Sequence, residues 1–279
     1  MRRNQLIVIS ACTAILIAIY VFGSTKKPVD KDAAGPMGGH AAPQQQAAAP
    51  VEALDIEAYV AELKNKADAN TRQTIDGAEK TQAYDILITT YKKMDKPLAV
   101  AYYAVKQAEK ANSAAQYVSV GDYNATLLQT APDDKARKFL AGNMIACYKK
   151  AVDIDTNITE NRIRLAGAYM EEGSQPMSGV LMLLDIVHKD STNVDAQLML
   201  GRFGLISGQI DKAIARFEKV LYLQPQNSEA LFLLAEAYND QGSKQKAIDL
   251  LERCKKTVKD PATKKDIEKA IESIKKPKG

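Results

Sequence analysis

The side chains that most often carry chemistry are scarce in this chain of 279 residues. Its two histidines are His40 and His188, and its three cysteines are Cys12, Cys147 and Cys254. No Cys/His or Ser/His/Asp set can be assembled from them, and no glycine-rich phosphate loop or metal-spaced cluster occurs. We therefore predict that the protein is not an enzyme and that it binds no cofactor and no metal ion.

The composition favours a core of aliphatic side chains between closely packed helices. Hydrophobic residues make up 46% of the chain, tryptophan is absent and aromatic residues amount to 6%. The net charge is only +4, but residues 253–279 are strongly basic. Because a nucleic-acid binder needs a broader basic surface with base contacts, we expect no nucleic acid as partner. The tail is interpreted as the solvated face of a capping helix, with anionic lipid or an acidic partner as the alternative.

The N-terminus predicts a membrane anchor. The segment 1–5 is short and basic, and residues 6–22 contain no charged side chain. Seventeen helical residues rise about 25 Å, just enough for a thin hydrocarbon core. A cleaved signal peptide and a lipoprotein signal ending at Cys12 are the alternatives. Arg2 and Arg3 favour a cytoplasmic N-terminus, which would place the rest of the protein on the other side of a bacterial inner membrane, in the periplasm.

Two segments separate this anchor from the remainder. Residues 23–54 are rich in Pro, Ala and Gln and have too few large apolar groups to bury, so they predict a flexible linker. Residues 55–80 return to helical periodicity and predict N-terminal helices, with Asp55 as a helix N-cap.

A repeat of 34 residues dominates the C-terminal half. Residues 194–227 align with residues 228–261 without a gap, so that Gly208 meets Gly242 and Ala213 meets Ala247. Each copy reads as two amphipathic helices joined at the glycine, and Pro225 ends the second helix of the first copy. Such a fixed period with helix–turn–helix content is typical of a helical solenoid.

The array extends in both directions from these copies. Residues 159–193 form a third clear unit with one extra residue, and less regular units reach back to residue 81. Residues 262–279 predict a basic capping helix and tail that cover the last apolar surface. The sequence thus predicts an all-α solenoid over residues 81–261, of about four to five helix–turn–helix units plus the cap, behind a single transmembrane helix.

These copies place small or apolar residues at fixed positions, and in this they resemble the tetratricopeptide repeat, or TPR, family over residues 82–261. The residues that carry the likeness include Leu200, Gly201 and Phe217 in one copy and Leu234, Ala235 and Leu251 in the next. The resemblance implies binding of a protein or peptide segment in the concave face. The layout of anchor, linker and repeats is also similar to bacterial inner-membrane proteins that present TPRs to the periplasm, and mitochondrial import receptors share it.

By position in the repeat, the resemblance places nine residues of the first helices in that concave groove. Lys and Asn do not occupy the positions of a carboxylate clamp, which argues against an acidic chaperone tail as ligand. An amphipathic helix or apolar extended segment suits the groove better. The predicted partner-binding residues are Ile163, Met170, Leu198, Arg202, Leu205, Ile206, Phe232, Glu236 and Asn239.

The sequence therefore predicts a membrane-tethered, non-enzymatic scaffold that assists assembly, export or chaperone machinery in the cell envelope. One alternative is a self-associating adaptor, which would be a homo-oligomer. Another is a regulatory subunit of a membrane enzyme or transport complex. The repeats do not identify the partner.

Overall fold

The computed structural model describes residues 53–173 and 175–276, in which thirteen helices and no strand occur. The predicted all-α repeat solenoid is confirmed. The predicted anchor at residues 6–22 and nearly all of the predicted linker lie outside the described residues. Among those that are described, no helix combines the length and the apolar character needed to cross a membrane.

Five helix hairpins form the body of the array, preceded by two helices and followed by one. The helices are α2 (Ile56–Lys66), α3 (Ala69–Thr81), α4 (Tyr84–Lys93), α5 (Pro97–Ala111), α6 (Ala114–Leu128), α7 (Asp134–Ile154), α8 (Thr159–Glu172), α9 (Pro176–Lys189), α10 (Val194–Ile206), α11 (Ile210–Leu223), α12 (Ser228–Asp240), α13 (Lys244–Thr257) and α14 (Pro261–Lys275).

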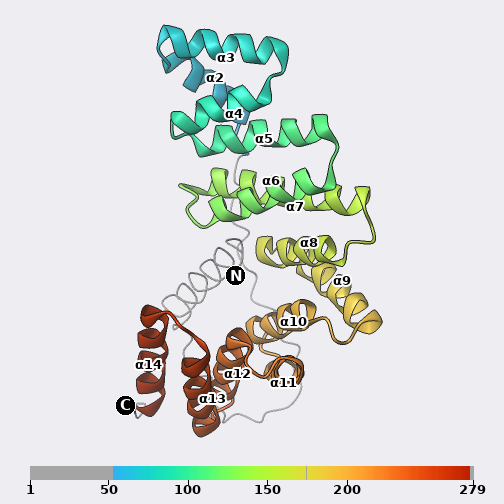
Figure 1. Ribbon diagram of the computed structural model, residues 1–279, viewed down its shortest axis with the longest axis vertical. Helices are drawn as coiled ribbons and strands as arrows, with labels where there is room; N and C mark the ends of the chain where they lie inside the picture. Colours follow the sequence, from blue (N-terminus) through green and yellow to red (C-terminus); the bar gives the residue numbers. More distant parts are fainter. Residues whose placement is uncertain (1–52, 174, 277–279) are drawn as a thin grey trace, which may run out of the picture.

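Each hairpin packs on the next, so that the helices follow one another along the molecule from α2 to α14 (Figure 1). The pairs are α4 with α5, α6 with α7, α8 with α9, α10 with α11 and α12 with α13. The path is not straight: Figure 1 shows the array turning between α9 and α10. A solenoid of this kind exposes one long inner face, which is where its side chains can meet a partner.

The repeat period has a direct physical basis in its turns and caps. Gly208 and Gly242 adopt φ values of +74° and +86° in the turns within their hairpins, a region that residues with a Cβ rarely enter. Asn193 and Asn227, also 34 residues apart, each accept a hydrogen bond from a backbone N–H of the helix that follows, at 2.9 Å. The chain therefore begins and reverses each of these two hairpins with the same devices.

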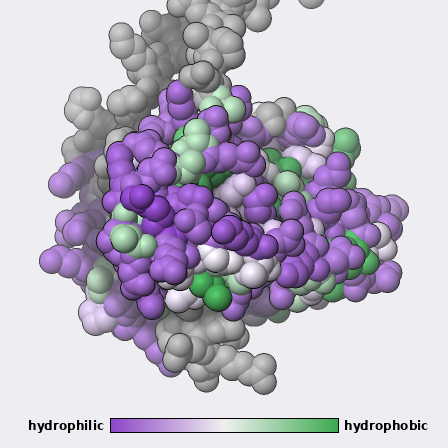
Figure 2. Space-filling view, turned by 90° about the horizontal axis from the view of Figure 1, so that it is seen from above, coloured by the Kyte–Doolittle hydropathy of each residue, from purple (hydrophilic) through white to green (hydrophobic). Residues whose placement is uncertain are grey.

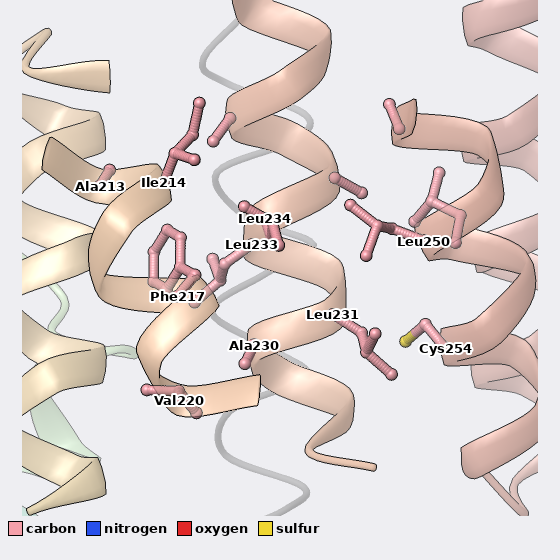
Figure 3. Close-up of a cluster of buried hydrophobic side chains, with 14 of the residues drawn as sticks. Ala213, Ile214, Phe217, Val220, Ala230, Leu231, Leu233, Leu234, Leu250 and Cys254 are labelled. Atoms are coloured by element: carbon pink, nitrogen blue, oxygen red, sulfur yellow. The ribbon is translucent and has the colours of Figure 1, made fainter. Parts of the chain in front are cut away.

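The largest core cluster joins the two regular copies and the final helix. Figure 3 shows side chains of α11, α12 and α13 meeting between the three helices, among them Phe217, Leu234 and Leu250. Ile267 and Ile271 of α14 are buried in the same cluster. Helix α14 therefore packs over the end of the array.

The opposite end of the array has a polar cover. Seen from that end, the surface is mainly hydrophilic (Figure 2). There Lys64 of α2 lies 3.1 Å from Asp76 and 2.9 Å from Glu79 of α3, and Asp55 accepts the N-capping hydrogen bond predicted for it. Both ends of the array are therefore covered. Apolar side chains that remain exposed between the ends are not explained by an uncovered end of the repeat array.

Candidate partner-binding surface

The first helices of the last three hairpins form a continuous layer. Helix α10 contacts both α8 and α12, whereas the second helices α9, α11 and α13 are more widely spaced. In a curved array, the layer whose helices touch lies on the inside of the curve. We call the solvent-facing side of this layer the inner face. We define it by the seven predicted partner-binding residues on α8, α10 and α12 that are not fully buried, which are Met170, Arg202, Leu205, Ile206, Phe232, Glu236 and Asn239.

The apolar side chains of the inner face differ in how far they are exposed to solvent. Ile206, at the end of α10, is 77% exposed. Leu205 and Phe232 are half-buried against the core cluster of α10 to α14, and Met170 is half-buried against that of α8 to α10. Asn239 is exposed near the end of α12. The surface thus offers apolar anchors with a polar border, a combination found where peptides dock.

Two predicted groove residues have a different place. Ile163 and Leu198 are each only 6% exposed, and both belong to core clusters. Adjacent residues of a helix are separated by about 100° around its axis. A small rotation of the helix about this axis therefore moves a side chain from the open face into the contact with a neighbouring helix. The expectation that these two side chains line the groove is therefore corrected: they hold the repeats together.

An ion pair crosses the inner face between two repeats. The guanidinium of Arg202 on α10 donates a hydrogen bond to the carboxylate of Glu229 in the first turn of α12. Both side chains are partly shielded from water, at 31% and 26% exposure. Glu229 was not among the predicted residues. The available signal was an acidic side chain in the first turn of the next repeat, next to its N-cap Asn227.

Glu236 is the most strongly perturbed carboxyl group of this face. Burial raises its pKa to about 7, and the nearby charge of Asp240 acts in the same direction, while Arg202 opposes them. A carboxyl group in such surroundings is partly protonated near neutral pH and can donate as well as accept a hydrogen bond. At this position the inner face can therefore form a hydrogen bond with either a donor or an acceptor of a partner.

Nothing brought together on this surface resembles catalytic machinery. Cys147 and Cys254 are buried, and burial raises the pKa of their thiols to about 12 and about 11. Within residues 53–173 and 175–276, no group of His, Cys, Asp and Glu has the arrangement of a metal site. The geometry offers adhesion through apolar anchors and a few charges, which is the chemistry of protein recognition.

Comparison with known proteins agrees with that chemistry. A family model described as tetratricopeptide repeat matches residues 204–263, which include all of α11, α12 and α13. This part of the chain carries tetratricopeptide repeats, as the 34-residue period predicted, and such repeats indicate a protein–protein interaction scaffold.

One curated relative is a peroxisomal targeting signal receptor of Candida albicans (strain SC5314 / ATCC MYA-2876). It is 36% identical over 84 residues, which are 30% of this chain and 14% of the receptor. The match thus spans a small part of that protein's length.

Among solved structures, this chain is similar to a MamA protein, with 19% identity, coverage of 64% of this chain and 92% of that one, and a TM-score of 0.46. MamA 41-end from Desulfovibrio magneticus RS-1 is 14% identical, with 68% and 96% coverage and a TM-score of 0.47. YrrB, described as a TPR protein with an unusual peptide-binding site, is 16% identical, with 72% and 98% coverage and a TM-score of 0.43.

Proposed function

We propose that the tetratricopeptide repeats of this chain capture a segment of a partner protein on the inner face, and that residues 6–22 tether the repeats to a membrane. The bound segment is an amphipathic helix or an apolar extended stretch that sets its apolar side chains between Ile206 and Phe232. The protein then acts as a scaffold that brings its partner to membrane-bound machinery for assembly, export or chaperoning in the cell envelope.

The observation that carries this proposal is the exposure of apolar side chains beside a charged pair on a closed, capped array. Ile206 leaves most of its surface in water although both ends of the solenoid are covered. Next to it, Arg202 and Glu229 fix the spacing of α10 and α12 across the same face. A surface that combines exposed apolar side chains with a charged pair is typical of a docking site.

The tether rests on sequence alone. Residues 6–22 carry no charge and follow Arg2 and Arg3, a pattern that favours an N-terminus in the cytoplasm and repeats in the periplasm. A topology reporter fused after Gly279 tests this directly. Activity of a reporter that functions only in the periplasm supports the orientation, whereas activity of a cytoplasm-only reporter contradicts it.

The inner face is tested by affinity capture of the full chain from membranes in mild detergent. Arg202→Ala combined with Phe232→Ala should reduce recovery of the partner at least tenfold, because it removes one charge and one half-buried aromatic anchor. Tyr222→Ala is the matched control, since Tyr222 is 80% exposed on α11, away from this face. Thermal unfolding of each variant separates loss of binding from loss of fold.

Two outcomes would reject the scaffold as proposed. Unchanged recovery with the Arg202/Phe232 pair replaced would show that the partner binds elsewhere. Recovery of this chain and nothing else would show self-association, which is the adaptor alternative.

A further inference from the structure

A second groove lies between the second helices α9 and α11, apart from the inner face. It has a volume of about 570 Å³ and runs over α10, which forms its floor. Figure 1 shows α9 and α11 on either side of α10. Its floor and walls are lined by Met177, Val180, Leu184, Gln197, Leu200, Phe203, Gly204, Gln209, Lys212, Ala215, Arg216 and Lys219. None of these belongs to the inner face.

The wall formed by α9 is apolar where solvent reaches it. Met177 and Leu184 line the groove at 57% and 39% exposure, and Leu181 on the same helix is 62% exposed. The spacing of four and three residues places all three on one side of α9. Three large apolar side chains in one exposed row form a patch of the kind that marks an interaction site.

The repeat itself shows that this apolar row is not needed for packing. The second helices of the next two repeats have small or polar residues at the equivalent positions, 34 and 68 residues further on. Those residues are Asp211, Ala215 and Glu218 on α11, and Gln245, Asp249 and Glu252 on α13. Both of these helices pack into the same array with polar outer rows. The apolar row of α9 is therefore a property of this one repeat.

The opposite wall is basic. Lys212, Arg216 and Lys219 follow one another at four and three residues on α11, facing the row on α9. Their contacts are uncharged: Lys212 donates to the side-chain carbonyl of Gln209 at 2.7 Å, Arg216 donates to that of Gln197 at 2.8 Å, and Lys219 lies over the Tyr222 ring.

None of these three cations is within salt-bridge distance of a carboxylate in the described residues. Elsewhere in that part of the chain, basic side chains such as Arg162, Arg164 and Arg202 do have such partners. Three adjacent cations without an internal acid leave a local positive field along one wall.

We infer that this groove is a second docking site, and that its occupant is an acidic amphipathic helix of a partner protein. The apolar side of the helix rests on Met177 and Leu184, and its carboxylates face Lys212, Arg216 and Lys219. Charge complementarity selects this occupant, because the groove joins an apolar wall to a wall of three unpaired cations.

The termini of this chain do not fit the same requirement. Residues 1–52 contain five Lys and Arg and three Asp and Glu, and residues 253–279 are strongly basic as well. Both segments would bring like charge to the wall formed by α11. The occupant therefore belongs to another protein. Since the groove does not share a lining residue with the inner face, the two surfaces can hold two partners, or two segments of one partner, at once.

The test uses the full chain and two synthetic helical peptides of 15 residues labelled with fluorescein. One carries leucines at helical spacing on one side and glutamates on the other, and its matched partner has lysine in place of every glutamate. Fluorescence anisotropy should show the glutamate peptide binding at least tenfold more tightly than the lysine peptide. Its affinity should also fall with added salt.

Two charge-reversed variants locate the binding. Lys212→Glu with Lys219→Glu should weaken binding of the glutamate peptide at least tenfold. Lys246→Glu with Arg253→Glu makes the same change of charge at the equivalent positions of α13 and should alter it less than twofold. Leu184→Asp should also weaken binding about tenfold, and thermal unfolding checks that each variant folds.

Five results would overturn the inference. The two peptides bind equally, which would show that charge does not select the occupant. The two charge-reversed pairs have equal effects, which would indicate attraction by net charge alone. Arg202→Ala, on the inner face, weakens the peptide as much as the Lys212/Lys219 pair does. Sedimentation shows a dimer that Leu184→Asp dissociates, so that a second copy covers the row. Phosphatidylglycerol vesicles bind the chain and compete with the peptide, so that the face is a membrane surface.

Discussion

The ring of Phe217 on α11 lies directly against Gly201 on α10. A Cβ added to Gly201 would overlap the ring edge and lie 2.7 Å from Cζ of Phe217. In the next repeat, Ala235 stands at the position of Gly201 and Leu251 at that of Phe217. Two residue pairs therefore fill the same helix–helix contact in successive hairpins: a glycine packs against a large ring in one, and an alanine packs against a smaller aliphatic side chain in the next.

Gly201→Ala should lower the free energy of unfolding by about 1–3 kcal/mol, because the added methyl group overpacks the contact with Phe217. Chemical denaturation followed by circular dichroism measures it. Gly142→Ala is the control: it lies within α7 with nothing within 4 Å of the added Cβ, so it should stabilise the protein by about 0.5–1 kcal/mol.

Adding Phe217→Leu to Gly201→Ala reproduces the pair of the next repeat. The double variant should be destabilised by at least about 1 kcal/mol less than the sum of the two single losses. The smaller side chain at position 217 makes room for the methyl group at position 201, and the methyl group fills part of the space that the ring leaves. Additive effects would show that the two residues do not constrain each other.

The repeat architecture was accessible from the sequence because its signals are local. Gly208 and Gly242 are required by left-handed turns, and Pro225 directly follows Gln224, the C-cap of α11. The Asn193 and Asn227 caps obey the same period. Each of these acts on a few neighbouring residues, so its effect does not depend on how the repeats pack.

The binding surfaces depend on relations between helices, which a single helix does not encode. Leu198 and Leu205 both read as apolar groove residues, yet only Leu198 is turned fully into the core. For the same reason, the sequence does not predict that the apolar row of α9 is exposed. Leu181 and Leu184 look like core residues until the wide spacing of the second helices leaves them in water.

Asp122 on α6 links three helices, α6, α7 and α8. Its Oδ1 accepts hydrogen bonds from the Tyr148 hydroxyl on α7 and from Nη1 of Arg164 on α8, each at 2.7 Å. Asp122→Ala should lower the free energy of unfolding by about 1–2 kcal/mol, because the largely buried Tyr148 hydroxyl loses its acceptor. Lys149→Ala, exposed on α7, should change it by less than about 0.5 kcal/mol.

A double-mutant cycle of Asp122→Ala with Tyr148→Phe isolates the hydrogen bond. Once the hydroxyl is absent, Asp122→Ala should have a smaller effect. An unchanged effect of Asp122→Ala in the Tyr148→Phe background would mean that the carboxylate stabilises the protein through Arg164 alone.

The two cysteines of the array should be inert in the folded state. Cys147 and Cys254 are at most 2% exposed, and burial raises the pKa of their thiols to about 12 and about 11. Little thiolate is present at pH 8, and the thiolate is the reactive form. In a Cys12→Ser background, a thiol reagent should label neither residue within minutes and both after denaturation. Rapid labelling of one residue would locate an opening of its hairpin.

Glu236 gives the protein a pH dependence of defined sign. Its pKa in the folded chain is about 7, above the ordinary value of 4.5, so the folded state holds this proton more tightly than the unfolded state. The free energy of unfolding should therefore fall as pH rises from 5 to 8, by about 1–3 kcal/mol. Carboxyl groups whose pKa is lowered, such as those of Asp185 and Asp260, titrate below this range.

Glu236→Gln keeps the shape of the side chain and removes the titration. Denaturation at several pH values should show that the variant loses most of the slope between pH 5 and 8 and is more stable than the unmodified chain at pH 8. An equal slope in both proteins would assign the pH dependence to another group. Because Glu236 faces Arg202 on the inner face, the same pH series applied to partner capture shows whether the carboxyl group serves binding as the proton donor or as the anion.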